Sequence, residues 1–523
     1  MKKITSLLTV LFIESSIAFG QAGTLDISFD GDGIVTTPIG IFYEDAYALC
    51  VQQDEKIIAA GYSNSSTNYF FDYDFALVRY NADGSLDPSF GIGGKVTTDF
   101  GSIGDFGLSA VLQPDGKIIV TGETYINGNY NDGFAVARYN EDGTLDNSFS
   151  TDGKVTVDFG SGDDVSFKVV VQPDGKILVA GYAFSGTQTM FALLRLDSTG
   201  IPDNTFGNSG KVMQAIGSYN DRAYDLALLP DGKIIAAGRS DNGTTYDFAL
   251  VRFNSNGSID NSFGTNGTVT TDIANADDYG NAMSLQPDGK IIVSGYTGDI
   301  LSITKFAMIR YDSLGTIDNT FGSNGRVTTA LTNHDESYAI TLQPDQKILL
   351  AGRSYNGSNN DFGIARYDSN GSPDTSFDSD GNLTLPISNG HDEAFAMAMQ
   401  QDGKILIAGR AEYSTDDFAL IRIFSDVATE MINPEQSSEP PFIYPNPSSG
   451  VATLSYTLLQ NQNIAIELYN LMGKRELVLV NGKQSAGEHT SQLNLKNLFP
   501  GMYMIRMVTE EGIFSKQLLV SGE

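Results

Sequence analysis

The chain is built from short apolar or alternating runs bounded by Gly, Asn, Asp and Pro. In the second copy of a repeated unit, four such runs lie at about 108–112, 117–121, 134–139 and 154–157. Runs of this length between turn-forming residues are typical of β-strands joined by tight turns. We denote them strands a, b, c and d. The pattern predicts one four-stranded sheet per unit.

The same unit recurs seven times. Gln113-Pro114-Asp115-Gly116-Lys117 opens strand b, and variants of this phrase return every 57 to 61 residues. A glycine always follows five places after the lysine. The lysines and glycines are Lys56 and Gly61, Lys117 and Gly122, Lys176 and Gly181, Lys233 and Gly238, Lys290 and Gly295, Lys347 and Gly352, and Lys404 and Gly409. Four strands repeated seven times predict a seven-bladed β-propeller.

Strand a has a small residue ten places before each lysine, whereas the next position often carries a large one. The small residues are Ala46, Gly107, Ser166, Ala223, Gly280, Ser337 and Ala394. Crowding near a central axis requires small side chains, so strand a is expected to be innermost. The repeat is also cut out of phase, because the chain starts with a strand d and its last unit ends after strand c, near Ile423. Residues 34–37 should therefore complete the seventh blade and leave no open sheet edge.

These units resemble the delta-60 repeat, a propeller-forming repeat of secreted bacterial proteins. The matching phrases are the Gln113–Lys117 turn, the strand Phe75–Tyr80 and Leu86–Gly91, and the likeness covers about residues 23–425. The resemblance implies the propeller fold and no activity. The chain has no Trp, which excludes a WD-type repeat.

The C-terminal part has a different pattern. Residues 426–441 are rich in Pro, Ser and Glu and read as a linker. Residues 442–523 resemble the type A sorting domain of the type IX secretion system. The matching segments are Tyr444–Pro447, Ile464–Leu468 with Gly473-Lys474, Leu498–Tyr503 and Lys516–Val520. The resemblance implies a small β-sandwich that is removed after export by the type IX machinery, with release of the protein or its attachment at the surface. An ordinary accessory β-sandwich is the alternative.

The N-terminus has the pattern of a secretory signal peptide over residues 1–20. Lys2 and Lys3 precede the mostly apolar stretch Ile4–Ile13, and Ala18 and Gly20 suit cleavage before Gln21. No later run of about 20 apolar residues predicts a membrane span. The domains expected are thus a signal peptide, a propeller over 21–425, the linker and the sorting domain. We expect a secreted or surface-located, all-β protein.

Composition excludes several functions. The formal net charge of −32 leaves no surplus of Lys and Arg for nucleic acid. The single cysteine, Cys50, lies in an apolar strand pattern and suits a core position, and the three histidines share no ligand-like spacing. No G-x-S-x-G, H-E-x-x-H or phosphate-loop motif occurs. No catalytic residue is therefore predicted, and no cofactor is required.

Each unit has an acid twelve places before its lysine, at the start of strand a. These acids are Glu44, Asp105, Asp164, Asp221, Asp278, Asp335 and Asp392. They should ring one mouth of the central channel. A ring of carboxylates suits a hard cation such as calcium, but a residue present in every blade favours a structural role, in which each carboxylate accepts backbone N–H bonds.

Each strand c carries an arginine in step with Phe and Leu, and a second acid precedes a Ser/Thr-Phe pair. Buried charges require partners, so we predict one Arg–Asp pair per blade. These are Arg79–Asp87, Arg138–Asp146, Arg195–Asp203, Arg252–Asp260, Arg310–Asp318, Arg366–Asp374 and, across the closure, Arg422–Asp26. Lys168 and Asp225 interrupt strand a in adjacent blades and are expected to form an ion pair.

A binding site should break the sevenfold symmetry. The loop between strands b and c of the first unit is the longest and gathers Tyr69, Phe70, Phe71 and Tyr73. Exposed aromatics of this kind could bind a glycan or a protein, or they could pack on the next blade. The favoured function is a secreted or surface binding or adhesion module. The alternative is a secreted hydrolase acting on a glycan or peptide at the propeller funnel.

Overall fold

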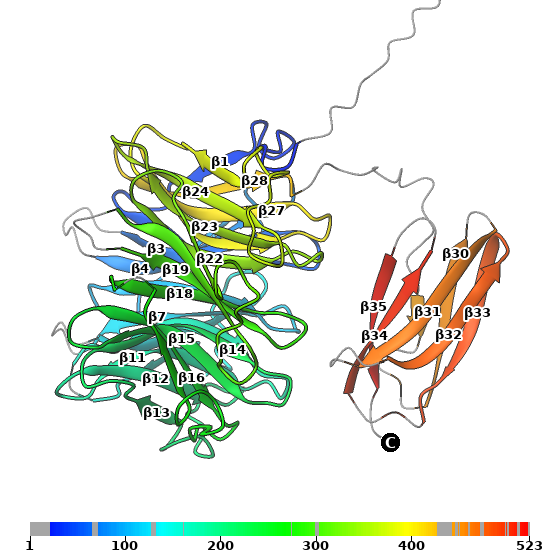
Figure 1. The fold of residues 1–523 in the computed structure, drawn as a ribbon, viewed down its shortest axis with the longest axis horizontal. Coiled ribbons are helices and arrows are strands. Elements are labelled where there is room, and N and C mark those ends of the chain that lie inside the picture. The colour runs from blue at the N-terminus through cyan, green and yellow to red at the C-terminus, as the bar shows by residue number, and fades with distance from the viewer. Residues whose placement is uncertain are drawn as a thin grey trace, which may run out of the picture. The chain divides into compact units, whose positions relative to one another are not determined.

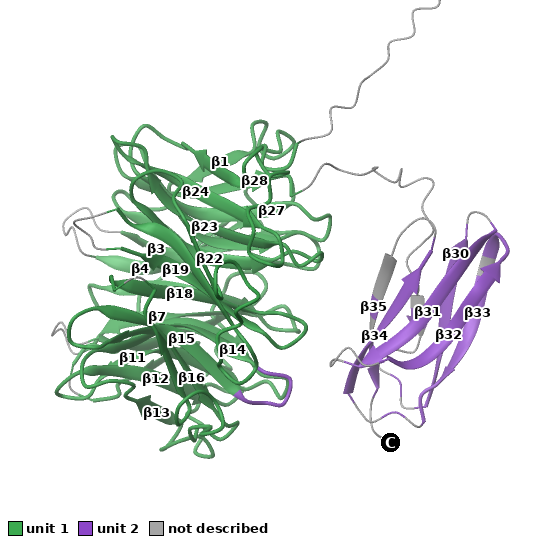
Figure 2. Cartoon of the chain, in the orientation of Figure 1, with its two compact units in different colours: residues 1–228, 234–428 green, residues 229–233, 429–523 purple. Residues whose placement is uncertain are grey.

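The computed structural model describes residues 21–64, 72–126, 132–160, 162–273, 275–298 and 303–425, and, further on, residues 442–444, 448, 450–458, 461–470, 475–496, 498, 501–509 and 513–520. Within these ranges the chain forms strands and turns and no helix. The predicted signal peptide and linker lie outside the described residues. Figure 2 colours two compact units, residues 1–228 with 234–428, and residues 229–233 with 429–523. Leu229–Lys233 is the turn between the first two strands of blade 4.

Seven four-stranded antiparallel sheets form the blades, which follow one another along the chain (Figure 1). Blade 1 is β2 (Glu44–Val51), β3 (Ile57–Asn64), β4 (Tyr73–Tyr80) and β5 (Lys95–Thr98); blade 2 is β6 (Asp105–Leu112), β7 (Ile118–Tyr125), β8 (Asp132–Tyr139) and β9 (Lys154–Val157); blade 3 is β10 (Val165–Val171), β11 (Ile177–Phe184), β12 (Thr189–Leu196) and β13 (Lys211–Gln214). Blade 4 is β14 (Asp221–Leu228), β15 (Ile234–Asp241), β16 (Tyr246–Phe253) and β17 (Thr268–Thr271); blade 5 is β18 (Asp278–Leu285), β19 (Ile291–Thr297), β20 (Lys305–Tyr311) and β21 (Arg326–Thr329). Blade 6 is β22 (Asp335–Leu342), β23 (Ile348–Tyr355), β24 (Asn360–Tyr367) and β25 (Asn382–Leu385). The predicted seven-bladed fold is confirmed.

Blade 7 is assembled from both ends of the propeller. Its strands are β26 (Asp392–Met399), β27 (Ile405–Glu412), β28 (Asp416–Ile423) and β1 (Ile34–Thr37). Ile34 pairs with Ile421 and Thr37 with Phe418, in antiparallel register. In Figure 1 the blue strand β1 accordingly lies beside the yellow β28. The predicted closure by residues 34–37 is confirmed.

The middle strands of each blade are apolar on both faces because each blade is covered by two neighbours. On β3, Ile57 and Ala59 pack toward blade 7, whereas Ile58 and Ala60 pack toward blade 2. Successive side chains of a strand point to opposite faces of its sheet, so a strand between two neighbours needs an unbroken apolar run. This explains the continuous hydrophobic stretch that follows each repeated lysine.

Strand a is the innermost strand, as predicted, since each one packs on the strands a of both adjacent blades. The small residues sit where neighbouring backbones meet. A Cβ on Gly107 of blade 2 would lie 2.4 Å from the carbonyl oxygen of Gly61 in blade 1. The observed contact therefore restricts this position to small side chains.

Each strand a also carries a β-bulge directly after its small residue. The extra residues are Tyr47, Leu108, Phe167, Tyr224, Asn281, Tyr338 and Phe395. The repeated glycine of strand b permits this arrangement. A Cβ on Gly122 would lie 1.7 Å from the backbone oxygen of Phe106, and the distances at the other six glycines are 1.7–1.9 Å. A bulge re-aims the side chain that it carries, and these seven residues face the axis.

The C-terminal unit has two sheets around one core. Its strands are β29 (Phe442–Tyr444), β30 (Val451–Leu458), β31 (Gln462–Asn470), β32 (Arg475–Gln484), β33 (Gly487–Asn494), β34 (Gly501–Val508) and β35 (Ile513–Val520). The sheets have the orders β29-β30-β33 and β32-β31-β34-β35. Leu454 from one sheet and Ile466 and Ile505 from the other belong to a single buried cluster. This is the β-sandwich expected for this part of the chain.

Candidate functional site

The structure brings the two partners of every predicted Arg–Asp pair together. In each blade the arginine Nε lies 2.8 or 2.9 Å from an aspartate Oδ2, including Arg422 and Asp26 across the closure. The arginine also reaches the next blade. Arg138 donates to the backbone oxygen of Ser198 at 2.6 Å, and its guanidinium lies over the ring of Phe149. We call these seven pairs the outer belt.

The outer belt keeps its carboxylates charged. Burial opposes ionisation of Asp374, but hydrogen bonds from Ser376 and the nearby Arg366 and Lys347 outweigh it and lower the pKa to about 2. Each aspartate thus pairs with a buried arginine, and each arginine contacts the next blade. The belt is filled in every blade and joins neighbouring blades, which favours the structural role predicted for these pairs.

The ring acids at the start of strand a are buried and accept backbone N–H bonds. Asp105 Oδ2 accepts from Phe100 N at 2.6 Å, and Asp392 Oδ2 accepts from Ile387 N at 2.7 Å. Burial raises the pKa of Glu44 to about 7 and that of Asp164 to about 6. These carboxylates hold the loop that enters each blade, which is the structural reading of the repeated acid.

Two ring acids also lie in groups of three carboxylates. Asp74, Asp99 and Asp105 form one group and Asp247, Asp272 and Asp278 the other, with possible ligand atoms within 4.8 Å of one another in each. Carboxylate oxygens at such distances are ligands that calcium accepts. Among the described residues, these groups are the places that could hold a hard cation.

The aromatic cluster predicted between strands b and c is only partly described. Tyr69, Phe70 and Phe71 lie outside the described residues, so binding by this loop stays a prediction. Tyr73 begins β4, and its ring packs on Tyr62 of its own blade at 5.3 Å and on Phe106 of blade 2 at 4.8 Å. For Tyr73 the structure therefore shows contact with the next blade.

A cavity of about 590 Å³ lies on the propeller axis, lined by the bulge residues, their neighbours on the seven strands a and three residues of strands b. Its aromatic lining comes from six blades: Tyr47, Phe167, Tyr224, Tyr279, Tyr296, Tyr338 and Phe395. Cavities of 300–1,000 Å³ with apolar walls and a few polar groups are typical of ligand sites. Unlike the outer belt, this lining differs from blade to blade.

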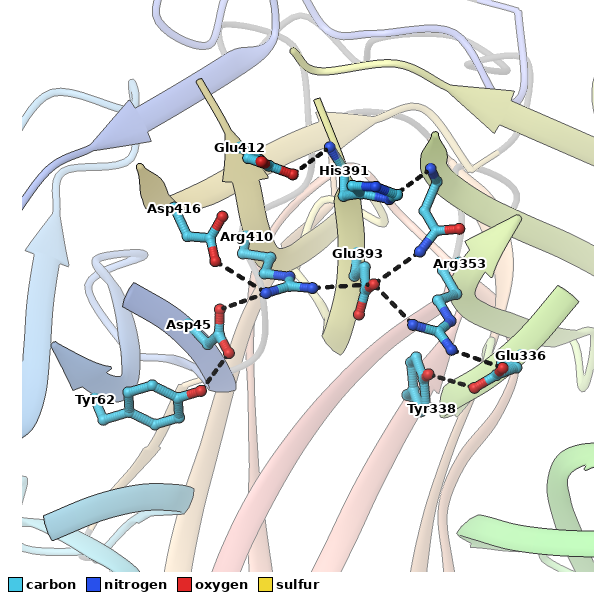
Figure 3. Close-up of polar contacts among 11 residues, drawn as sticks. Asp45, Tyr62, Glu336, Tyr338, Arg353, His391, Glu393, Arg410, Glu412 and Asp416 are labelled. Atoms are coloured by element: carbon cyan, nitrogen blue, oxygen red, sulfur yellow. Dashed lines mark hydrogen bonds and ion pairs between the residues drawn. The ribbon is translucent and has the colours of Figure 1, made fainter. Parts of the chain in front are cut away.

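One side of the cavity carries an ion-pair chain that runs through blades 6, 7 and 1 (Figure 3). Arg353 contacts Glu336 at 2.7 Å and Glu393 at 2.9 Å. Arg410 contacts Glu393 at 3.1 Å and lies 3.9 Å from Asp45. Tyr338 donates to Glu336, Tyr62 to Asp45, and Asp416 accepts from Arg410. Each acid of this chain therefore has a polar partner.

The two acids on either side of Arg410 differ in their protonation. Burial raises the pKa of Asp45 to about 6, despite the nearby Arg410 and the hydrogen bond from Tyr62. Burial also opposes ionisation of Glu393, but its contacts with Arg353 and Arg410 outweigh burial, so its pKa is lowered. Near pH 6, one acid is partly protonated and the other is charged.

The opposite wall holds different chemistry. Lys168 of blade 3 and Asp225 of blade 4 form the expected ion pair, at 3.1 Å. The guanidinium of Arg239 lies over the rings of Tyr246 at 4.2 Å and Tyr279 at 4.4 Å. A guanidinium over tyrosine faces is a cation–π arrangement.

The sequence reasoning missed most of this lining. Besides the bulge residues of strand a, the lining includes a position on strand b that differs between blades and contributes Arg239, Tyr296 and Arg410. Each follows the repeated glycine. The residue at this position is Tyr62, Glu123, Tyr182, Arg239, Tyr296, Arg353 or Arg410, and this variation among the seven copies is the signal in the sequence.

Family comparisons agree with the seven-bladed fold. A family model described as a domain of unknown function (DUF5122) beta-propeller matches residues 52–90, 113–149, 172–206, 229–263, 286–321, 343–377 and 400–426. The chain carries seven DUF5122 β-propeller repeats. Each match covers strands b and c of one blade, with its arginine and the turn that follows.

The DUF5122 propeller is followed by an export domain. A model described as a secretion system C-terminal sorting domain matches residues 442–521. This confirms the predicted type IX sorting domain and indicates export to the cell surface or the extracellular space. No helix within the described ranges is long and apolar enough to cross a membrane. The signal peptide stays a prediction.

Solved structures that are similar to this chain share little of its sequence. A polysaccharide lyase, Uly1, is 12% identical with a TM-score of 0.41, covering 73% of this chain and 90% of its own. Sqt1 from Chaetomium thermophilum is 12% identical with a TM-score of 0.37, covering 75% and 100%. Similarity at this level says nothing about function. No curated protein matches the chain.

Proposed function

We propose that the propeller is a secreted binding module that holds an extracellular carbohydrate in the cavity on its axis. The observation that carries this proposal is the lining of aromatic rings from six blades around about 590 Å³. Flat aromatic faces pack against the apolar faces of sugar rings, while tyrosine hydroxyls offer hydrogen bonds to sugar hydroxyls. The sorting domain supports an extracellular ligand, since it directs export.

The bulges supply the lining without altering the fold. Tyr47 and Phe395 lie in neighbouring blades with ring centroids 4.4 Å apart and planes 10° apart, so the two stacked rings support one another. Tyr279 and Tyr296 form a second stacked pair at 4.6 Å. Rings that support one another lose little freedom when a ligand binds, which favours affinity. A glycan fits this surface better than a flexible peptide, because its rings are rigid.

The test is a binding screen of the secreted protein against neutral and acidic oligosaccharides, followed by titration calorimetry. Phe395→Ala should weaken the best neutral or acidic binder about tenfold or more, because it removes an aromatic face worth at least ~1.4 kcal/mol. Tyr219→Ala is the matched control, since this tyrosine is 53% exposed outside the cavity. Thermal unfolding of both variants checks the fold.

Two results would overturn the proposal. One is that no oligosaccharide binds, and the other is that Phe395→Ala binds as the parent does. A protein or peptide that binds instead, in a manner sensitive to Phe395, would assign the cavity to another ligand class.

A secreted hydrolase is the second candidate, and the acids beside Arg410 favour it. Glycoside cleavage requires one protonated and one charged carboxyl group, and the pKa values of Asp45 and Glu393 are shifted in opposite directions. Binding is preferred because both acids are held by Arg410. Chromatography of bound oligosaccharides after long incubation separates the two, since cleavage products that vanish in Asp45→Asn would establish hydrolysis.

A further inference from the structure

Three blades place an arginine directly after the repeated glycine of strand b, which allows a comparison within one molecule. In blades 6 and 7 the residue opposite on strand a is an acid, so that Arg353 pairs with Glu336 and Arg410 with Glu393. In blade 4 the residue opposite Arg239 is Arg222. The arginine at this position thus faces an acid in blades 6 and 7, whereas in blade 4 it faces a second arginine.

The surroundings of the blade 4 arginines provide rings rather than carboxylates. Arg222 lies over Tyr182 at 4.3 Å, and Arg239 lies over Tyr246, Tyr279 and, at 5.8 Å, Tyr224. Neither guanidinium has a carboxylate within ion-pair distance among the residues that the structure describes. The Nε atom of each is buried and has no hydrogen-bond partner in that same set.

This arrangement of two arginines costs free energy. Like charges directly opposite each other on adjacent strands are destabilising, and a partly buried charge without a counter-ion loses hydration. Two nearby acids do not relieve it, because Asp225 is held by Lys168 and burial raises the pKa of Glu123 to about 8 despite its interaction with Arg222. A bound anion would supply the missing partner, and guanidinium groups bind carboxylate and sulfate through paired N–H donors.

We propose that Arg239, assisted by Arg222, is an anion subsite, and that the carbohydrate of the cavity is acidic. This rests on the proposed function and adds the ligand's charge. Arg239 lines the cavity together with Tyr224, Tyr279 and Tyr296. A carboxylate or sulfate group on a sugar would contact the guanidinium while its ring packs on these tyrosines.

The overall charge of the chain does not oppose this assignment at short range. The net charge of −32 is spread over the whole sequence, and at physiological ionic strength charges are screened beyond about 8 Å. Within that distance the ligand meets Arg239, whereas the lining acids Asp225, Glu336 and Glu393 are each paired with a lysine or an arginine. Acidic oligosaccharides should therefore associate more slowly at low salt, yet remain bound through the subsite.

The test compares galacturonate oligosaccharides, their carboxyl-reduced neutral forms and sulfated galactan oligosaccharides with the full secreted protein. At least one acidic form should bind tenfold or more tightly than its neutral counterpart, and the two acidic arms distinguish carboxylate from sulfate. Arg239→Gln should abolish this preference, whereas Arg239→Lys should keep part of it. Arg326→Gln, an arginine of β21 outside the cavity, is the matched control and should retain it.

The outcomes are distinguishable. Equal binding of acidic and neutral forms that is unchanged in Arg239→Gln overturns the anion subsite but leaves the carbohydrate proposal standing. Absence of binding in every arm overturns both. Because Arg239→Gln removes a repulsion, it should fold at least as well as the parent, so a loss of binding with an unchanged or higher Tm reports on the subsite itself.

Discussion

The outer belt and the inner wall, by which we mean the lining of the axial cavity, are built from the same seven units. The residues of the belt are the same in every blade, whereas those of the wall differ. On strand c every blade has the same arginine, paired with the same aspartate at 2.8 or 2.9 Å. On strand b the residue after the glycine is tyrosine, arginine or glutamate, depending on the blade. The belt joins neighbouring blades, whereas three of these strand b residues, Arg239, Tyr296 and Arg410, line the cavity. Residues that are identical in all blades make the contacts between blades, whereas positions that differ between blades contribute to the cavity lining.

The sharpest way to test the belt is to remove one of its acids. Asp374→Ala leaves Arg366, whose side chain is fully buried, without its carboxylate. Stability should fall by about 3–5 kcal/mol, the usual cost of an unpaired buried charge. Denaturant unfolding of the parent and variant measures this. A loss below 1 kcal/mol would show that the belt does not hold the blades.

The glycine of strand b connects the two regions, and its replacement should be next in effect. In Gly238→Ala the new Cβ would lie 1.9 Å from the backbone oxygen of Arg222. Relieving this clash requires the bulge to move, at a cost of about 1–3 kcal/mol. Unfolding measurements should show the loss, and ligand affinity should fall because Tyr224 is displaced. An alanine tolerated with parental stability and affinity would contradict the proposed role of the glycine.

The two sets of acids should oppose each other in their pH dependence. The pKa of Asp374 is lowered to about 2, so its contribution is present above about pH 4 and is lost as the pH falls. Burial raises the pKa of Asp278 to about 6. The unfolded chain then releases this proton first, and stability falls as the pH rises from about 4 through 6.

Stability is therefore expected to be highest in mildly acidic solution. Asp278→Asn should flatten the fall toward neutral pH by on the order of 2 kcal/mol, since it removes the proton that the folded state retains. Urea unfolding at several pH values measures this. A variant whose profile matches the parent's would show that Asp278 does not contribute to it.

The smallest effect is expected for an ion pair of the wall. In Lys168–Asp225 the lysine is 39% exposed, so solvent screens the pair. Lys168→Met should cost about 1 kcal/mol or less, well below the loss for Asp374→Ala. A loss as large as that of the belt variant would remove the distinction between the two regions.

The fold could be predicted from the sequence because the same motifs recur in seven repeated units. The blade number, the innermost strand and the closing strand all follow from phrases that recur, and the Arg–Asp partners were chosen because both members recur in step. The cavity lining was not predicted, because its residues differ from blade to blade. Arg239 and Glu393 have no counterparts of their own kind in most blades, so repetition does not single them out.

The β-bulge of strand a is a second reason why the cavity lining could not be predicted from the sequence. Without the bulge, simple alternation along strand a would place Tyr47 toward a neighbouring blade. The register shift between Ala46 and Ala48 turns it toward the axis instead. A bulge depends on the close approach of Gly61 to the backbone of Asp45, and that approach is a property of the paired strands rather than of either segment alone.

The strand that closes the ring also sets an order of events. β1 is made almost first, yet its partner β28 comes after nearly the whole propeller. A growing or translocating chain therefore holds an unmatched strand until Ile423 has emerged. The sorting domain lies beyond that point, at 442–521. A chain that ends before its last blade would lack both the partner strand of β1 and the sorting domain. Only a chain long enough to complete the ring therefore carries the domain that directs export.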